Sequence, residues 1–202
     1  MIETVTKDLP TAVDEKGNPK TILVTGATGY IGGRLIRELL SHDYNVRVLV
    51  RNAKRLVDYS WRQSVEVIEG DANDQEVLAK AMHGTHIAYY LLHALNSKFD
   101  FVSEERELAN NFGRACKENG VERIIYLGGL AKADSPLSAH LGARQETGQI
   151  LRRSGVPTVE LRAGIVLGSG SASFEMLRNL TERLPVMITP KWVNNRIQPI
   201  AI

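Results

Sequence analysis

The segment TILVTGATGYIG, residues 21–32, decides the fold of this chain. Residues 21–25 are β-branched or aliphatic and predict a buried strand, and apolar residues recur at helical spacing from Tyr30 onwards. Three glycines separate the two patterns: Gly26, Gly29 and Gly32. A strand, a glycine-rich turn and an amphipathic helix in direct succession are typical of a turn that binds phosphate groups.

Each glycine meets a steric requirement of such a turn. Gly26 permits the tight bend, Gly29 lets a diphosphate approach the backbone without a Cβ in the way, and Gly32 lets the helix pack close to the strand. The first helical turn, with Tyr30 and Ile31, then offers free N–H groups and the positive end of the helix dipole. The spacing is G-x-x-G-x-x-G rather than G-x-G-x-x-G, and as a string alone it is weak evidence. The strand before it and the helix after it make it strong evidence for a phosphate-binding turn. We expect a dinucleotide here, with Thr28 among its contacts.

Composition indicates one globular domain. The chain has 202 residues, 43% hydrophobic and 24% charged, and no apolar run is long enough for a membrane helix. A formal charge of +2, with acids and bases mixed, argues against nucleic acid as a main partner. The single cysteine, Cys116, fits a reducing compartment, so we expect a cytoplasmic protein in which Cys116 is a buried helix residue. Residues 1–19 are expected to form a flexible leader, and 20–202 the domain.

From Lys20 onwards the sequence alternates between short strand patterns and helical patterns. Strands are predicted at 21–25, 45–50, 65–69, 86–92, 123–127 and 158–161, and helices from about 30 and at 74–82, 100–119, 138–154 and 172–184. Right-handed crossovers then predict an α/β protein with a doubly wound parallel sheet, the Rossmann fold. Because 192–202 is an apolar extended run, we expect the domain to be truncated at its C-terminal end, with a substrate-facing portion beyond Ile202.

The end of the second predicted strand bears on the choice of cofactor. An NAD enzyme places an acidic residue there for the ribose hydroxyls, whereas this chain has Arg51, followed by Lys54 and Arg55. Guanidinium groups bind phosphate through charge-assisted hydrogen bonds, so NADP(H) is preferred and NAD(H) remains open, as does a simple solvated basic loop. Asp71, after the third strand, can accept from the adenine amino group or act as an ordinary turn residue.

Several motifs together resemble the atypical and extended short-chain dehydrogenase/reductase superfamily, and within it the NmrA-like NAD(P)H-binding proteins. The resemblance covers roughly residues 20–168. Its carriers are 25–32, 48–51, 70–71, 88–92, 124–129 and 161–168. The resemblance implies that Leu91 and Leu92 border the cofactor ribose and that Gly164 lies near the nicotinamide.

The sequence departs from the superfamily at the catalytic positions. Reductases of the superfamily use a serine after the fifth strand and a Tyr-x-x-x-Lys pair, but Gly128 and Gly129 stand in the serine region. His140 and Arg144 replace the pair. An imidazole titrates near neutral pH, so His140 is a candidate acid, with Arg144 holding the nicotinamide ribose and Gly128 near the cofactor. Alternatively, His140 is a surface residue at a helix start and only Arg144 binds cofactor.

Other polar residues give weaker signals. His93 follows the fourth strand at the carboxyl edge and is a candidate for contact with substrate. Ser135 and Ser138 can contact substrate or cap the next helix. His83 and His86 fall at the opposite edge of the sheet, and no spacing of ligands indicates a metal site.

Three hypotheses remain for the function. The first is an oxidoreductase that transfers hydride between NADP(H) and a small carbonyl, enone or quinone-like substrate. The second is a regulatory or assembly protein that senses NADP(H) without catalysis, which the loss of the Tyr-x-x-x-Lys pair favours. The third and weakest is a nucleotide-sugar epimerase or dehydratase, which would need the missing tyrosine. A homodimer is possible by analogy, and the sequence leaves the substrate open.

Overall fold

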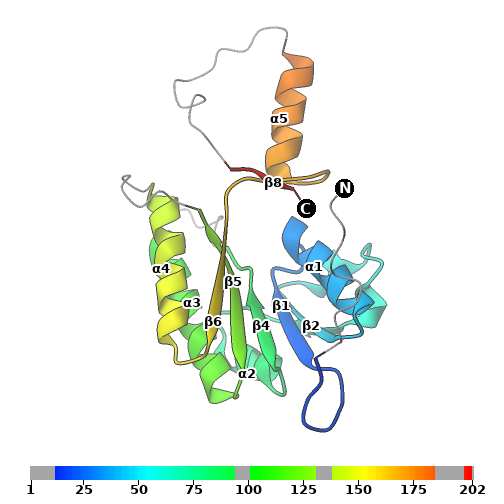
Figure 1. Ribbon diagram of the computed structural model, residues 1–202, viewed down its shortest axis with the longest axis vertical. Coiled ribbons are helices and arrows are strands. Elements are labelled where there is room, and N and C mark those ends of the chain that lie inside the picture. Colours follow the sequence, from blue (N-terminus) through cyan, green and yellow to red (C-terminus); the bar gives the residue numbers. More distant parts are fainter. Residues whose placement is uncertain (1–11, 94–100, 131–137, 185–197, 202) are drawn as a thin grey trace.

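A six-stranded parallel sheet forms the centre of the protein, in a computed structural model that describes residues 12–93, 101–130, 138–184 and 198–201 (Figure 1). Its strand order is β3-β2-β1-β4-β5-β6. The strands are β1 (Thr21–Thr25), β2 (Asn45–Val50), β3 (Glu66–Glu69), β4 (Ile87–Tyr90), β5 (Arg123–Gly129) and β6 (Thr158–Ala163). The order reverses between β1 and β4, which is the arrangement of the Rossmann fold. The predicted fold class is therefore confirmed.

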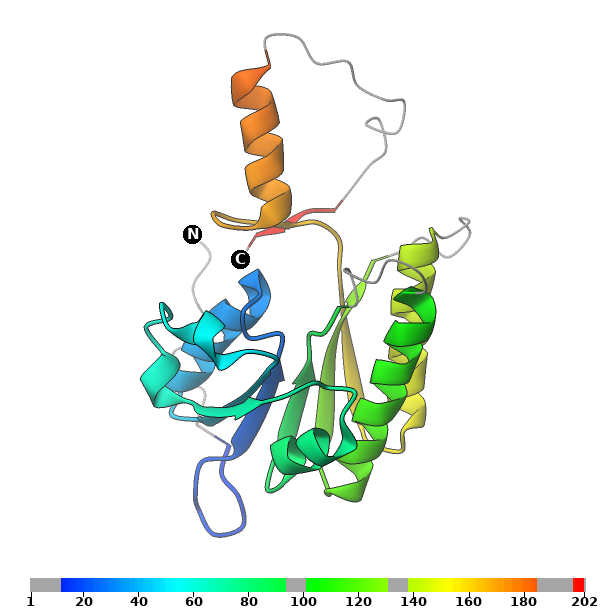
Figure 2. The same cartoon turned by 180° about the vertical axis from the view of Figure 1, so that it is seen from behind.

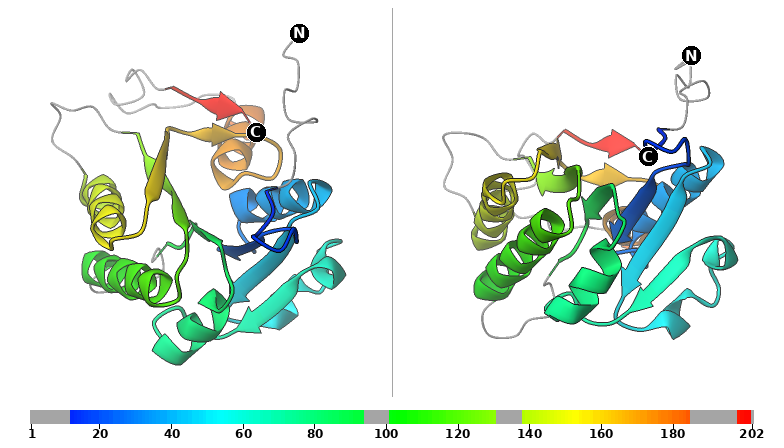
Figure 3. Two further views of the ribbon diagram at one scale, coloured as in Figure 1. Left: turned by 60° about the horizontal axis from the view of Figure 1, so that its bottom comes forward. Right: turned by 90° about the horizontal axis from the view of Figure 1, so that it is seen from below.

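Helices cover both faces of this sheet. They are α1 (Tyr30–Ser41), α2 (Gln75–Met82), α3 (Phe101–Glu118) and α4 (Ala139–Arg153), with short 3-10 helices η1 (Ala53–Leu56) and η2 (Arg62–Ser64). A further helix, α5 (Ala172–Arg183), lies outside these layers. Figure 3 shows α2, α3 and α4 over one face, with α1 over the other. One buried cluster includes Leu78, Phe112 and Leu151, and a second includes Ile36 and Leu56. Apolar helix stripes thus bury against the sheet from opposite sides.

The C-terminal elements stand apart from these layers. A two-stranded parallel ribbon pairs β7 (Val166–Leu167) with β8 (Ile200–Ala201), and α5 follows β7. Figures 1 and 2 show α5 beyond the carboxyl edge of the main sheet, with the ribbon between the two. No described helix combines the length and the apolar character that a membrane span requires.

The predicted elements agree with the structure to within a few residues. β4 is shorter than the predicted strand at 86–92, because only Ile87 to Tyr90 pair with neighbours. The 3-10 helices and the β7–β8 ribbon were not predicted. Cys116 is fully buried on α3, as expected, and burial raises the pKa of its thiol. Trp61 packs in the core at 3% exposure, whereas Trp192 lies outside the described residues.

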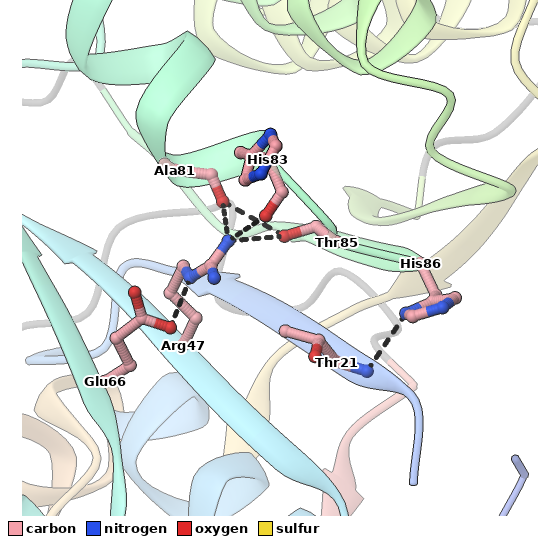
Figure 4. Close-up of polar contacts among 7 residues, drawn as sticks. All are labelled: Thr21, Arg47, Glu66, Ala81, His83, Thr85 and His86. Carbon is pink, nitrogen blue, oxygen red and sulfur yellow. Dashed lines mark hydrogen bonds and ion pairs between the residues drawn. The ribbon is translucent and has the colours of Figure 1, made fainter. Parts of the chain in front are cut away.

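At the amino edge of the sheet, polar side chains form hydrogen bonds within the chain (Figure 4). Arg47 of β2 donates from Nη1 to the carbonyl oxygens of Ala81 and His83, at 2.8 and 2.6 Å. It thereby satisfies carbonyls at the C-terminal end of α2. His86 accepts the backbone N–H of Thr21 through Nδ1 at 3.1 Å. His83 and His86 therefore lie at the edge that the sequence predicted, and their contacts there are structural.

At the other edge, a buried threonine joins the two strands where the strand order reverses. The Thr25 hydroxyl donates to the carbonyl oxygen of Tyr89 at 2.8 Å and accepts from the N–H of Leu91 at 3.1 Å. Thr25 is fully buried. The ends of β1 and β4 are thus tied by a side chain just before they lead into different loops.

Candidate functional site

The glycine turn after β1 leaves no room for a side chain at Gly26 or at Gly32. Gly26 has φ +70°, and a Cβ there would lie 2.6 Å from the carbonyl oxygen of Leu91. A Cβ on Gly32 would lie 2.3 Å from the carbonyl oxygen of Gly26. Both distances are far below van der Waals contact, so this turn accepts only glycine at the two positions. The first turn of α1 packs directly on the bend before it.

The N-terminus of α1 has no side-chain cap. Gly29 is its N-cap residue and provides no side-chain acceptor, whereas Asp74, Ser138 and Ser171 cap α2, α4 and α5 with their own oxygens. The Tyr59 hydroxyl donates to the carbonyl oxygen of Thr28 at 3.0 Å and fixes the turn from outside. The first N–H groups of α1 thus remain available to an anion, which the helix dipole stabilises.

A cavity of about 410 Å³ extends from this turn over the ends of β2 and β3. Arg51, Asn52, Arg55 and Asp71 line it, together with Leu92. Arg51 is exposed, and nothing in the described ranges forms an ion pair with it. Asp71 accepts the N–H of Asn73 through Oδ1 at 2.8 Å, so it has a turn role as well as a place in the cavity wall.

A larger cavity of about 1140 Å³ extends from the same turn over the ends of β4, β5 and β6. Of the residues predicted for the cofactor or for catalysis, its walls include Tyr30, Ile31, Gly128, His140, Arg144 and Gly164. The two cavities share Gly26, Gly29, Leu91 and His93. They therefore adjoin and form one crevice along the carboxyl edge, where open α/β sheets bind ligands. The structure brings the residues predicted for the dinucleotide and for catalysis to this crevice, whereas Ser138 lines neither cavity.

Arg144 is held by its own chain. Its guanidinium donates to the carbonyl oxygen of Leu127 and lies over the Tyr126 ring, 5.7 Å from the centroid. The Tyr126 hydroxyl in turn donates to the carbonyl oxygen of Arg144 at 2.9 Å. Burial raises the pKa of Tyr126 to about 12, so this phenol stays protonated. Arg144 is thus a fixed positive charge in the crevice wall.

His140 stacks on a second histidine. Its ring lies 5.2 Å from that of His93, with an interplanar angle of 15°. Partial burial lowers the pKa of His140, and the neighbouring His93 and Arg144 lower it further, against an opposing effect of Glu105. The neutral form of His140 is therefore favoured near neutral pH.

Sequence reasoning missed Glu105 of α3. Its side chain is only 7% exposed, and its Oε1 lies 2.9 Å from Nδ1 of His93. A signal was present, because Glu105 occupies the buried stripe of α3 with Leu108, Ala109 and Phe112, where an apolar residue is expected. A carboxylate at a core position usually has a charged or hydrogen-bonding partner.

The remaining candidates have close contacts within the chain. A Cβ on Gly128 would lie 2.8 Å from Oε1 of Glu160, and one on Gly164 would lie 2.5 Å from the carbonyl oxygen of Gln198. Ser138 accepts the N–H of Leu141 at 3.3 Å, which confirms its capping role, while Ser135 lies outside the described residues. The described ranges contain no group of three His, Cys, Asp or Glu side chains placed to hold a metal ion.

Comparison with known proteins gives the family. The model of the NmrA-like family matches residues 18–183, which is most of the chain. The chain belongs to the NmrA-like family. The matched range includes the glycine turn as well as His140 and Arg144, which line the larger cavity.

Among the proteins similar to this NmrA-like chain is the ceramide reductase of Caulobacter vibrioides, 26% identical over 87% of this chain and 55% of that protein. The triphenylmethane reductase of Citrobacter sp., solved with NADP(H), is 27% identical, with a TM-score of 0.63 over 80% of this chain and 55% of that one. WbmG of Bordetella bronchiseptica, solved with NAD, has a TM-score of 0.67 over 84% of this chain and 62% of that one at 20% identity, a likeness of fold alone. The chain spans about half the length of the ceramide reductase, and less of other curated relatives.

Proposed function

We propose that this chain binds a nicotinamide dinucleotide along the crevice, with NADP(H) preferred. We further propose that it is part of an oxidoreductase that transfers hydride between NADP(H) and a small carbonyl, enone or quinone-like acceptor. The observation that carries the proposal is the uncapped N-terminus of α1, which opens into a crevice where the strand order reverses. Backbone N–H groups and the helix dipole suit a diphosphate at this place.

The residues present fit such a cofactor in three groups. The diphosphate is assigned to the turn with Gly26, Thr28, Gly29, Tyr30, Ile31 and Gly32. The adenosine half is assigned to the smaller cavity with Arg51 and Asp71, and the riboses to Leu91 and Leu92. The nicotinamide end is assigned to the larger cavity with Gly128, Arg144 and Gly164. When bound, the cofactor supplies or takes up the hydride, and these residues hold it in place.

The preference for NADP(H) rests on charge at the end of β2. Arg51 and Arg55 both line the smaller cavity, where an NAD enzyme has an acidic residue. A 2′-phosphate offers these guanidinium groups bidentate partners. Calorimetry with NADPH and NADH tests the preference, and we expect tighter binding of NADPH. Equal dissociation constants would remove it.

The relatives support a reductase. The ceramide reductase of Caulobacter vibrioides and the NADP(H)-bound triphenylmethane reductase of Citrobacter sp. both carry that activity in their names. Sequence reasoning selects His140, beside Arg144 in the larger cavity, as the acid, but the lowered pKa of His140 favours its neutral form. The test is NADPH oxidation with a panel of aldehydes, enones, quinones and one triphenylmethane dye, using the full-length protein. We expect turnover with at least one of these acceptors.

A second function is favoured by the state of Arg144. Its guanidinium is already bound to the Leu127 carbonyl and the Tyr126 ring, and no tyrosine or lysine stands at the usual catalytic positions. A protein that senses NADP(H) without consuming it needs no more than this. Tight binding of NADPH and NADP⁺ with no oxidation of NADPH by the whole panel would establish this alternative.

A further inference from the structure

The junction of the two cavities holds a carboxylate–imidazole pair that the His-x-x-x-Arg motif does not include. Glu105 comes from α3 and His93 from the segment just after β4. The Glu105 Oε1 and the His93 Nδ1 are 2.9 Å apart. In this pair the carboxylate fixes the orientation of the ring, as it does for many histidines that act in catalysis or bind metals.

The two side chains of the pair differ in their burial. The Glu105 side chain is 7% exposed and the His93 side chain 28% exposed. A buried carboxylate is costly unless a positive or hydrogen-bonding group compensates it, and a protonated His93 provides both. The Glu105 carboxylate therefore directs the Nδ1–H of His93 toward itself.

His140 does not compete for that proton. Its ring stacks on His93 at 5.2 Å, so two imidazolium ions in the pair would repel each other. The lowered pKa of His140 agrees with a neutral ring. Other charged groups near the pair are Arg144 of α4, on the side of the larger cavity, and Glu104 of α3, on the side of the smaller one.

Position gives the pair access to a ligand. His93 lines both cavities, and no hydrogen bond to its Nε2 is present in the parts of the chain that the structure describes. With Nδ1 bound to Glu105, the other ring nitrogen is the one that can serve the crevice. The histidine that sequence reasoning offered as a substrate contact is thus the one with a positioned proton.

We infer that His93 is the proton donor of the crevice, that Glu105 is its positioning residue, and that His140 is a neutral stacking partner. The inference rests on the proposed function. A bound reduced cofactor would supply the hydride for the carbonyl carbon of the acceptor and would itself be oxidised, while the C=O π-electrons would move to oxygen. The proton leaves Nε2 of His93 and forms the O–H bond. The neutral imidazole keeps its Nδ1–H on Glu105 and regains a proton from water.

The first test locates the proton without turnover. Long-range ¹H–¹⁵N spectra follow the five histidines of the full chain through a pH titration, with His93→Gln and His140→Phe used for assignment. We expect the Nδ1 resonance of His93 to show a hydrogen-bonded N–H and His140 to titrate below the ordinary value of about 6.5. A His93 whose Nδ1 carries no proton in the wild-type spectra, or a His140 that titrates above this value, would overturn the inference.

Two neighbouring carboxylates on α3 provide a matched pair of variants. Glu105→Gln keeps the shape of the buried side chain but removes its charge, so the Nδ1 resonance of His93 should shift. Glu104→Gln removes a charge that also lines the crevice but does not bond to His93, and the shift should be smaller. Equal shifts in the two variants would show that Glu105 does not act through contact.

Kinetics then separates the inference from the proposed function. With an acceptor from the panel, His93→Gln should lower kcat about 100-fold at an unchanged dissociation constant for NADPH. His140→Phe should retain most activity, because a phenyl ring preserves the stack. Loss of activity in His140→Phe but not in His93→Gln would overturn the inference alone. Failure of the wild-type protein to bind NADPH would overturn the proposed function, and the proton transfer with it.

Discussion

The two edges of the sheet carry similar side chains in opposite settings. Each edge has a pair of histidines: His83 and His86 at the amino edge, His93 and His140 at the carboxyl edge. At the amino edge the Nδ1 of His86 accepts a backbone N–H, and the carbonyl of His83 accepts from an arginine. At the carboxyl edge the two rings stack on each other and line a cavity.

The arginines differ in the same way. Arg47 donates to Glu66 and to backbone carbonyls at the end of α2. Arg51, only four residues later and just after β2, lines a cavity instead. Strand direction explains the difference, because the carboxyl ends of parallel strands lead into loops that diverge at the reversal of order. Residue type alone therefore does not separate the two settings, whereas residue type together with the edge of the sheet does.

The largest expected effect breaks the carboxyl edge itself. Gly32→Ala places a Cβ 2.3 Å from the carbonyl oxygen of Gly26, so the turn must shift. We expect no measurable heat at NADPH concentrations that saturate the wild type, and a stability loss of about 1–3 kcal/mol. Gly142→Ala is the control, because no atom lies within 4 Å of the new Cβ and helix propensity should add about 0.5–1 kcal/mol. Unchanged binding in Gly32→Ala would show that this turn does not hold the cofactor.

A second change alters the smaller cavity without disturbing the fold. Arg51→Gln removes an exposed charge from the cavity wall. A lost charge-assisted hydrogen bond costs about 1.5–3 kcal/mol, so NADPH should bind about 10–100-fold more weakly while NADH is unaffected. Lys80→Gln, near the C-terminal end of α2, removes a like charge outside the crevice and should leave both constants unchanged. An equal loss for both nucleotides would argue against a contact with the 2′-phosphate.

The third change tests the amino edge. Arg47→Met leaves carbonyls at the end of α2 without their donor, which should cost about 1–3 kcal/mol in the free energy of unfolding. Dinucleotide binding by the folded protein should not change, since the contact lies at the opposite edge. Arg153→Met, an exposed position on α4, should change stability by at most about 0.5 kcal/mol. Denaturant unfolding and calorimetry on the same samples measure both quantities.

The smallest effect is a pH dependence of stability. The pKa of His140 is lowered in the folded chain, chiefly by partial burial, so the unfolded chain binds this proton more tightly. Stability should therefore decrease as the pH falls below the unfolded value of about 6.5. The His140→Gln variant lacks this titrating group. The Tm of the variant relative to that of the wild type should therefore rise as the pH is lowered from about 7.5 to about 5. A constant difference in Tm across this range would contradict the lowered pKa.

Local signals explain what the sequence could predict. The strand before Gly26, the uncapped helix after it and the cap of α2 at Asp74 are all determined by residues close in sequence. The β7–β8 ribbon was not predictable, because Val166 pairs with Ile200 across a long segment. The contact between His93 and Glu105 also depends on how α3 packs after β4, although a glutamate in an apolar stripe was a visible clue.

The hydroxyl of Thr25 has a consequence for how ligand preference can change in this protein. This hydroxyl bonds to the Tyr89 carbonyl of β4 and to the Leu91 amide just after β4. The distance between the carboxyl ends of β1 and β4 is therefore fixed. Substitutions of the side chains around it will not widen the gap between these two strand ends. A redesign for a larger or smaller ligand must therefore act on the cavity walls, through the residues that follow β2 and β6.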